Sequence, residues 1–192
     1  MRLAVLTGLY VGVVVSAQVG TNKIVDVPFT DLTAPGGTFL IGIALSLIEL
    51  AHRTAPTRRE GFVNAQVMVL CGWAASILLA AYLAILNVMS PDDPLFDRLA
   101  GTWRIVLGSL VAFLASETID NSFGAWLRDR VHDAVRVVAT NAVSVPLDSI
   151  VFLLVAFGSL EFIEGQIVVK YAATLIVGVP LVVALRRYVR PR

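Results

Sequence analysis

The sequence predicts an all-α, polytopic membrane protein with six transmembrane helices. Hydrophobic residues make up 57% of its 192 residues and charged residues only 15%, and the mean hydropathy is +0.82. Soluble domains are typically about 45–50% apolar and about 25% charged. Because one span takes about 20 apolar residues, a chain of this length has room for about six or seven spans and no soluble catalytic domain. We therefore expect residues 1–192 to form a single six-helix transmembrane domain.

Six apolar runs separated by polar clusters define the expected spans. The first follows a lone Arg2 and has no small-residue cleavage site before the polar "GTNK" segment, which indicates a retained helix rather than a cleaved signal peptide. The second is short, so an earlier start near Leu32 or a partly re-entrant path stays open. The expected spans are residues 3–19, 37–50, 62–86, 105–126, 135–157 and 167–185.

Basic residues gather in alternate loops, and this pattern predicts the orientation. Eleven of the fifteen basic residues fall on the side that holds both termini, whereas the other side carries the acidic segments "SPDDPLFD" and "LEFIEG". Positive charge accumulates in cytoplasmic loops, so both termini are expected in the cytoplasm. We interpret the arginines as topology signals and contacts to lipid headgroups. They are Arg2, Arg53, Arg58, Arg59, Arg128, Arg130, Arg136, Arg186, Arg187, Arg190 and Arg192.

Polar side chains within the spans are the candidates for function, since an ionised group at bilayer depth costs several kcal/mol unless it faces protein or water. On the fourth span, Glu117, Asp120 and Asn121 are three and four residues apart, so they share one helix face, which Gly124 and Arg128 continue. The alternative for each group is a structural hydrogen bond between helices.

Other spans carry polar groups of the same kind. The fifth has Asn141, Ser144 and Asp148 at helical spacing around Pro146, which can kink the helix. The first ends on Gln18, Asn22 and Lys23, and Lys170 lies just inside the sixth. The chain has thirteen arginines but only two lysines, and an ammonium suits a countercharge for a buried carboxylate. The two acidic stripes together predict a central binding pocket between helices.

Five segments resemble, in order and spacing, the VUT family of queuosine precursor transporters over nearly the whole chain. They are "SAQVGTNKIVDV", "LIELAHRTAPTRREGF", "SETIDNSFGAWLRDR", "ATNAVSVPLDSIVFLLVAFGS" and "GQIVVKYAATLIVGVPL". The family's motif positions fall on Gln18, Lys23, Ile119, Asp120, Phe123, Leu127, Arg128, Asp148, Ser149, Phe152 and Lys170. This sequence departs from the family where Leu45, Glu49 and "AH" replace an Asp, Glu and Tyr-Gly pattern. Gln18 stands where Asn is usual, and Glu117 where Gln is common.

The resemblance implies uptake of the bases 7-cyano-7-deazaguanine or 7-aminomethyl-7-deazaguanine, without enzymatic activity, metal or cofactor. A carboxylate can accept the two donors of a guanine-like edge, while amides or Lys donate to its carbonyl or nitrile. The resemblance also implies a location in the prokaryotic plasma (inner) membrane. The expected partners are this small molecule and the lipid bilayer, with a homodimer as an open option and no nucleic acid. The expected substrate-binding residues are Gln18, Asn22, Lys23, Glu49, Glu117, Asp120, Asn121, Asn141, Ser144, Asp148, Phe152 and Lys170.

Three other functions compete with this interpretation. A substrate-binding subunit of an energy-coupling-factor vitamin transporter has a similar size, and the small residues Gly12, Ser16 and Gly20 would suit docking to its partners, which include ATPases. A membrane enzyme is disfavoured because His52 and His132 stand alone in predicted loops, and a purely structural protein because the spans hold so many polar groups. Energy coupling stays open between proton linkage and facilitated diffusion.

Overall fold

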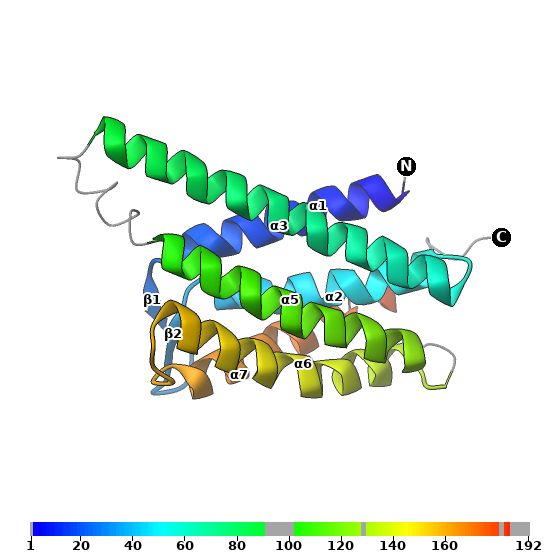
Figure 1. Cartoon of the computed structure of the whole chain (residues 1–192). Helices are drawn as coiled ribbons and strands as arrows, with labels where there is room; N and C mark the ends of the chain where they lie inside the picture. Colours follow the sequence, from blue (N-terminus) through cyan, green and yellow to red (C-terminus); the bar gives the residue numbers. More distant parts are fainter. Residues whose placement is uncertain (1, 91–101, 128–129, 181–182, 185–192) are drawn as a thin grey trace.

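A computed structural model describes residues 2–90, 102–127, 130–180 and 183–184, and these are mostly helical (Figure 1). The helices begin and end within four residues of the predicted spans wherever both ends are described, because long apolar runs are the strongest signal in the sequence. The elements are α1 (Arg2–Gly20), β1 (Ile24–Asp26), β2 (Thr33–Pro35), α2 (Thr38–Thr54), α3 (Arg58–Met89), α5 (Thr102–Leu127), α6 (Asp133–Ala156), α7 (Ile163–Ala173) and the π-helix η1 (Thr174–Gly178).

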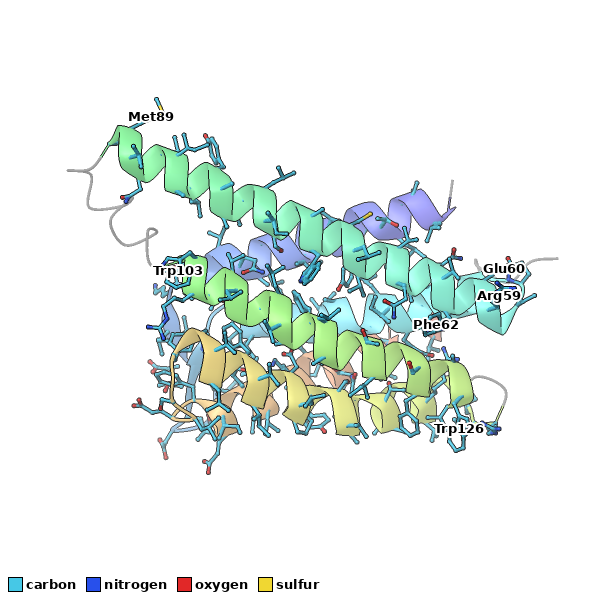
Figure 2. The ribbon with its side chains drawn as sticks, in the orientation of Figure 1. Arg59, Glu60, Phe62, Met89, Trp103 and Trp126 are labelled. Atoms are coloured by element: carbon cyan, nitrogen blue, oxygen red, sulfur yellow. The ribbon has the colours of Figure 1, made fainter. Side chains whose placement is uncertain are left out.

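Successive helices run in alternate directions along one bundle (Figure 1). One end of the bundle holds β1 and β2 and is called the hairpin end here. At the other end, called the terminal end, α1 begins and η1 comes to its close. Side chains at the helix tips mark the two ends: Met89 and Trp103 lie at the hairpin end, and Glu60 and Trp126 at the terminal end (Figure 2).

Among the residues that the structure describes, three helices are long and apolar enough to cross a membrane. They contain the segments Leu3–Gly20, Arg59–Met89 and Val138–Ala156, and α2 contains the shorter apolar segment Thr38–His52. Only 17% of the α3 segment is buried inside the protein, and large apolar side chains such as Leu78 and Ile85 are exposed along it. An apolar helix that leaves most of its surface uncovered needs lipid around it, which agrees with a membrane protein.

A short hairpin between α1 and α2 departs from the all-α prediction. Residues Ile24 to Asp26 pair antiparallel with Thr33 to Pro35, so the earlier start of the second span near Leu32 is wrong. The hairpin closes through Gly36 N, which donates to the carbonyl of Lys23 at 2.7 Å. It rests on α7, because a Cβ on Gly165 would lie 2.0 Å from the carbonyl oxygen of Thr33. This contact fixes the hairpin beside the first turn of α7.

The α5–α6 seam is lined by small or polar residues of α5, each four apart: Gly108, Ala112, Ser116 and Asp120. Residues at this spacing share one helix face. Across the seam a Cβ on Gly108 would lie 3.0 Å from Ala156 Cβ, while Ser116 contacts Asp148 and Asp120 contacts Ser144. Their partners on α6 are likewise four apart from 144 to 156, so the two antiparallel helices stay in register over more than three turns. The seam therefore holds two carboxylates at fixed heights in the bundle.

Enlarging the seam should destabilise the protein. Gly108→Val is expected to lower stability by about 1–3 kcal/mol, because the added atoms overlap Ala156 and overpacking costs this much. The matched control is Gly12→Val, since a Cβ on Gly12 meets nothing within 4 Å. Thermal unfolding midpoints of the purified proteins in detergent measure the difference, and equal midpoints for the two variants would contradict this packing.

Candidate functional site

A pocket lies toward the hairpin end, where five helices converge. All five helices contribute lining residues, so the pocket is assembled only in the folded bundle. The lining residues are Ala17 of α1 and Thr21 directly after it, Thr38 and Ile41 of α2, Ser109 and Phe113 of α5, Asp148 and Phe152 of α6, and Gln166 and Lys170 of α7.

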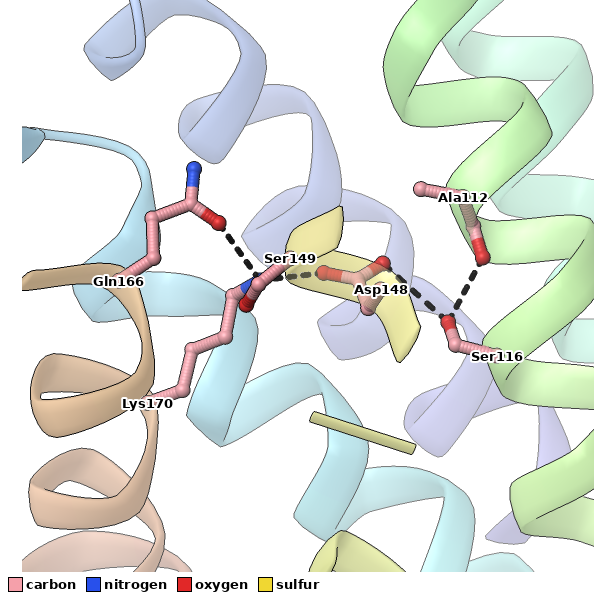
Figure 3. Close-up of polar contacts among 6 residues, drawn as sticks. All are labelled: Ala112, Ser116, Asp148, Ser149, Gln166 and Lys170. Carbon is pink, nitrogen blue, oxygen red and sulfur yellow. Dashed lines mark hydrogen bonds and ion pairs between the residues drawn. The ribbon is translucent and has the colours of Figure 1, made fainter. Parts of the chain in front are cut away.

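The charged centre of the pocket is an ion pair between Asp148 and Lys170. Lys170 Nζ lies 2.5 Å from Asp148 Oδ2, and it also donates to Ser149 Oγ at 2.9 Å and to Gln166 Oε1 at 3.0 Å. Figure 3 shows these three contacts converging on the ammonium. An ammonium has three protons, so all of its donors are used. Lys170 and Asp148 are only 2% and 4% exposed, and the pair thus neutralises two buried charges.

Ser116 connects this pair to α5. Its hydroxyl oxygen lies 3.2 Å from Asp148 Oδ1 and 2.7 Å from the carbonyl oxygen of Ala112 (Figure 3). One hydroxyl proton serves both acceptors, so Asp148 Oδ1 keeps capacity for a further donor. A ligand with an N–H group can use that capacity.

The pocket is narrow in this conformation. Its walls surround about 320 Å³, including the part that is open to solvent. The enclosed part has room for about one water molecule. A ligand with aromatic rings therefore requires side chains such as Phe113, Phe152 or Lys170 to move aside.

A second charged cluster lies toward the terminal end and is called the inner cluster: Glu49, His52, Asp120 and Arg136. Arg136 forms an ion pair with the Glu49 carboxylate, and its Nη2 donates to the Glu49 backbone carbonyl at 3.2 Å. On α5, Asp120 Oδ1 accepts from Ser144 Oγ at 3.1 Å. All four members of the cluster are at most 1% exposed.

The inner cluster corrects two predictions. Arg136 was expected in a cytoplasmic loop as a topology signal, and His52 alone in another loop. Instead α2 continues to Thr54 and α6 begins at Asp133, so both residues are helical and fully buried. Polar residues at the end of an apolar run lower the local hydropathy, and for this reason His52 fell outside the second expected span, and Arg136, at the edge of the fifth, was counted with the loop before it.

The other predicted residues are distributed over three places. Gln18 is buried but its Nε2 points to Ser76 Oγ of α3, at 3.3 Å, and not into the pocket. Asn22 and Lys23 are exposed in the turn after α1. Asn141 Nδ2 donates to Thr174 Oγ1 at 2.9 Å, where the π-helix begins.

Two further predicted residues, Glu117 and Asn121, belong to α5, but their side chains are not among those that the structure describes. Sequence reasoning missed Ser116 and Gln166, although both carry a usable signal. Each stands four residues before a residue of interest, Asp120 and Lys170, and therefore on the same helix face.

Comparison with known families supplies the class of protein. The model of the family described as "Putative vitamin uptake transporter" matches residues 36–185. The chain belongs to this family. Transporters of this kind are not an enzyme class, which agrees with the expectation of no enzymatic activity. The matched range includes both charged centres, the Asp148–Lys170 pair and the inner cluster. No match was found among curated proteins or among solved structures.

Breaking the Asp148–Lys170 pair should destabilise this transporter. Lys170→Met is expected to cost about 3–5 kcal/mol, because it leaves the Asp148 carboxylate buried without its countercharge. The double variant Asp148→Leu/Lys170→Met should recover part of this loss, since no charge then remains. Lys23→Met is the matched control because Lys23 is exposed. Thermal unfolding measures all four proteins, and a double variant less stable than Lys170→Met would contradict a compensating pair.

Proposed function

We propose that the chain is a six-span uptake transporter for the queuosine precursor bases 7-cyano-7-deazaguanine and 7-aminomethyl-7-deazaguanine. The observation that carries the proposal is the buried Asp148–Lys170 pair at the centre of a pocket walled by five helices. The two oxygens of the Asp148 carboxylate are acceptors, and the Lys170 ammonium next to them is a donor. A guanine-like edge has the complementary pattern, with two donors beside one acceptor. Membership in a family of uptake transporters supports the direction of transport.

Each part of the base has a partner among the lining residues of the pocket. The carboxylate of Asp148 accepts from the ring N–H and the exocyclic amine of the base, as carboxylates do in bidentate pairs. Lys170 or Gln166 donates to the carbonyl or nitrile after it releases its present partner. Phe113 and Phe152 line the same pocket and offer faces for the planar ring. Opening of the pocket by these side chains is then part of binding.

Alternation of the helices supports six spans with both termini on one side (Figure 1). On α5, the exposed Trp103 and Trp126 stand near its opposite ends. Their separation of 23 residues corresponds to roughly 35 Å of helix, slightly more than the ~30 Å hydrocarbon core, and Trp is enriched at both membrane interfaces.

The distribution of arginines along the sequence supports the orientation. The sequence where α2 ends and α3 begins, at the terminal end, carries Arg53, Arg58 and Arg59, whereas the basic residues described as exposed at the hairpin end are Lys23 and Arg104, next to the exposed Asp26, Glu161 and Glu164. By the positive-inside rule the terminal end is cytoplasmic. The pocket then lies toward the outside of a prokaryotic plasma membrane, where an imported base arrives.

A substrate-binding subunit of an energy-coupling-factor transporter is the second candidate. Gly8, Gly12 and Ser16 are exposed at four-residue spacing on α1, and a Cβ on either glycine would meet nothing within 4 Å. A stripe of small residues on the outer face allows another helix to approach closely. Co-purification of ATPase subunits, with loss of uptake when they are deleted, would favour this candidate over a self-sufficient transporter.

Uptake of the labelled base should depend on Asp148. In cells unable to make the precursor, Asp148→Asn is expected to reduce uptake at least about tenfold, because a charge-assisted hydrogen bond contributes about 1.5–3 kcal/mol. Glu117→Gln is expected to reduce it as well. The control Asp26→Asn changes an exposed carboxylate on β1 and should leave uptake unchanged. Full uptake by both test variants would rule out this assignment.

The topology predicts the location of the chain ends. Green fluorescent protein fused after residue 192 should fluoresce, and alkaline phosphatase at the same point should be inactive, because both report a cytoplasmic position. A fusion inserted at Phe29, the exposed tip of the hairpin, should give the opposite result. Matching results at the two points would contradict the proposed orientation.

A further inference from the structure

The inner cluster brings four ionisable side chains from three helices into one buried site. Glu49 and His52 come from α2, Asp120 from α5 and Arg136 from α6. Gly124 shows how closely they converge, because a Cβ placed on it would lie 3.5 Å from Glu49 Oε2 and 3.7 Å from the His52 ring. Thus the carboxylate and the imidazole both lie against α5, one turn beyond Asp120.

The surroundings of the site contribute no further described charge. From α3 the neighbour of His52 is Gly61, whose Cβ would lie 3.2 Å from His52 Nδ1, and the charged residues that precede it, Arg59 and Glu60, are exposed. On α6, the hydroxyl residues Thr140 and Ser144 follow Arg136 at four-residue spacing, and Ser144 reaches Asp120 of α5. The described charges facing one another are therefore those of the four cluster residues.

Their charges do not cancel without a proton. With His52 neutral, Arg136 contributes +1 and Glu49 and Asp120 each contribute −1, which sums to −1. A buried ion without a countercharge is strongly unfavourable. One proton, bound by a carboxyl group or by the His52 imidazole, makes the site neutral. By contrast the Asp148–Lys170 pair is already neutral, with +1 and −1 in contact.

Arg136 also retains binding capacity. Its Nε and Nη2 are used by Glu49, whereas its Nη1 is buried and has no hydrogen-bond partner among the described residues. A guanidinium is a permanent cation with five N–H donors, so the unused arm of Arg136 is able to donate to a second carboxylate. Protonation of Glu49 would weaken its hold on Arg136, and the guanidinium would then be attracted to Asp120.

We propose that Glu49, His52, Asp120 and Arg136 form a proton-binding site that couples uptake to one proton. The proton binds to a group of this cluster and leaves to the cytoplasm as the contact between α2 and α6 opens, with no other bond made or broken. The cluster is mechanically linked to the pocket, because Asp120–Ser144 and Ser116–Asp148 are successive contacts of the α5–α6 seam. The coupling, though not the proton site itself, rests on the uptake function proposed above.

Proteoliposomes containing the full-length protein test the coupling. With the membrane potential clamped, an inward gradient of one pH unit should drive accumulation of labelled 7-cyano-7-deazaguanine to about tenfold, the limit for one proton per base. Asp120→Asn and His52→Gln should equilibrate the base without accumulating it. The control Glu161→Gln, which changes an exposed carboxylate, should accumulate it like the native protein. Accumulation that ignores the pH gradient, or that persists in both variants, would overturn the proposal.

Infrared difference titration of the protein without the base tests the site independently, because carboxyl and imidazole bands are resolved. The native protein and Glu161→Gln should show the same buried group losing one proton, and Asp120→Asn and His52→Gln should both shift that titration. If neither variant shifts it, the proton site is wrong even when the base is transported. If both shift it but the base is not transported, the site stands and the proposed substrate fails.

Discussion

Buried charges have to be compensated in this bundle, and the packing of its helices follows from that requirement. Lys170 and Asp148 are held in contact between α6 and α7, and Ser116 of α5 supports the carboxylate from the other side. Neither charge could remain in the apolar interior alone. The small residues of the α5–α6 seam serve the same requirement. They allow the two helices to approach closely, and only a close approach lets Ser116 reach Asp148.

Helix α6 connects the two charged centres of the bundle. Arg136 and Asp148 are twelve residues apart on it, which corresponds to about 18 Å, and Pro146 lies between them near the second. Proline removes a backbone hydrogen bond and permits a bend at that level. The neighbouring α7 passes into a π-helix at Thr174, which is bound to Asn141. Irregular backbone at the same depth on two adjacent helices provides a place where the bundle can bend while its charged contacts remain paired.

Much of the fold could be predicted because hydropathy acts over long windows. The spans near 3–19 and 135–157 were found closely, since some twenty apolar residues in a row leave little choice of structure. The hairpin was not predicted, because strands of three residues carry no periodic signal and β2 is fixed by its contact with Gly165. For the site, Asp148 and Lys170 could be proposed as partners only in general terms, whereas their contact depends on how α7 packs against α6.

Composition and spacing along the chain were enough to identify a membrane protein with carboxylates inside its apolar helices. Which charges meet depends on how the helices pack. Arg136 and His52, expected in loops, are buried with Glu49. Of the two lysines, Lys23 is exposed whereas Lys170 is paired with Asp148. The physical reason is that the energy of a charge depends on its neighbours across helices, and those neighbours are far apart in sequence.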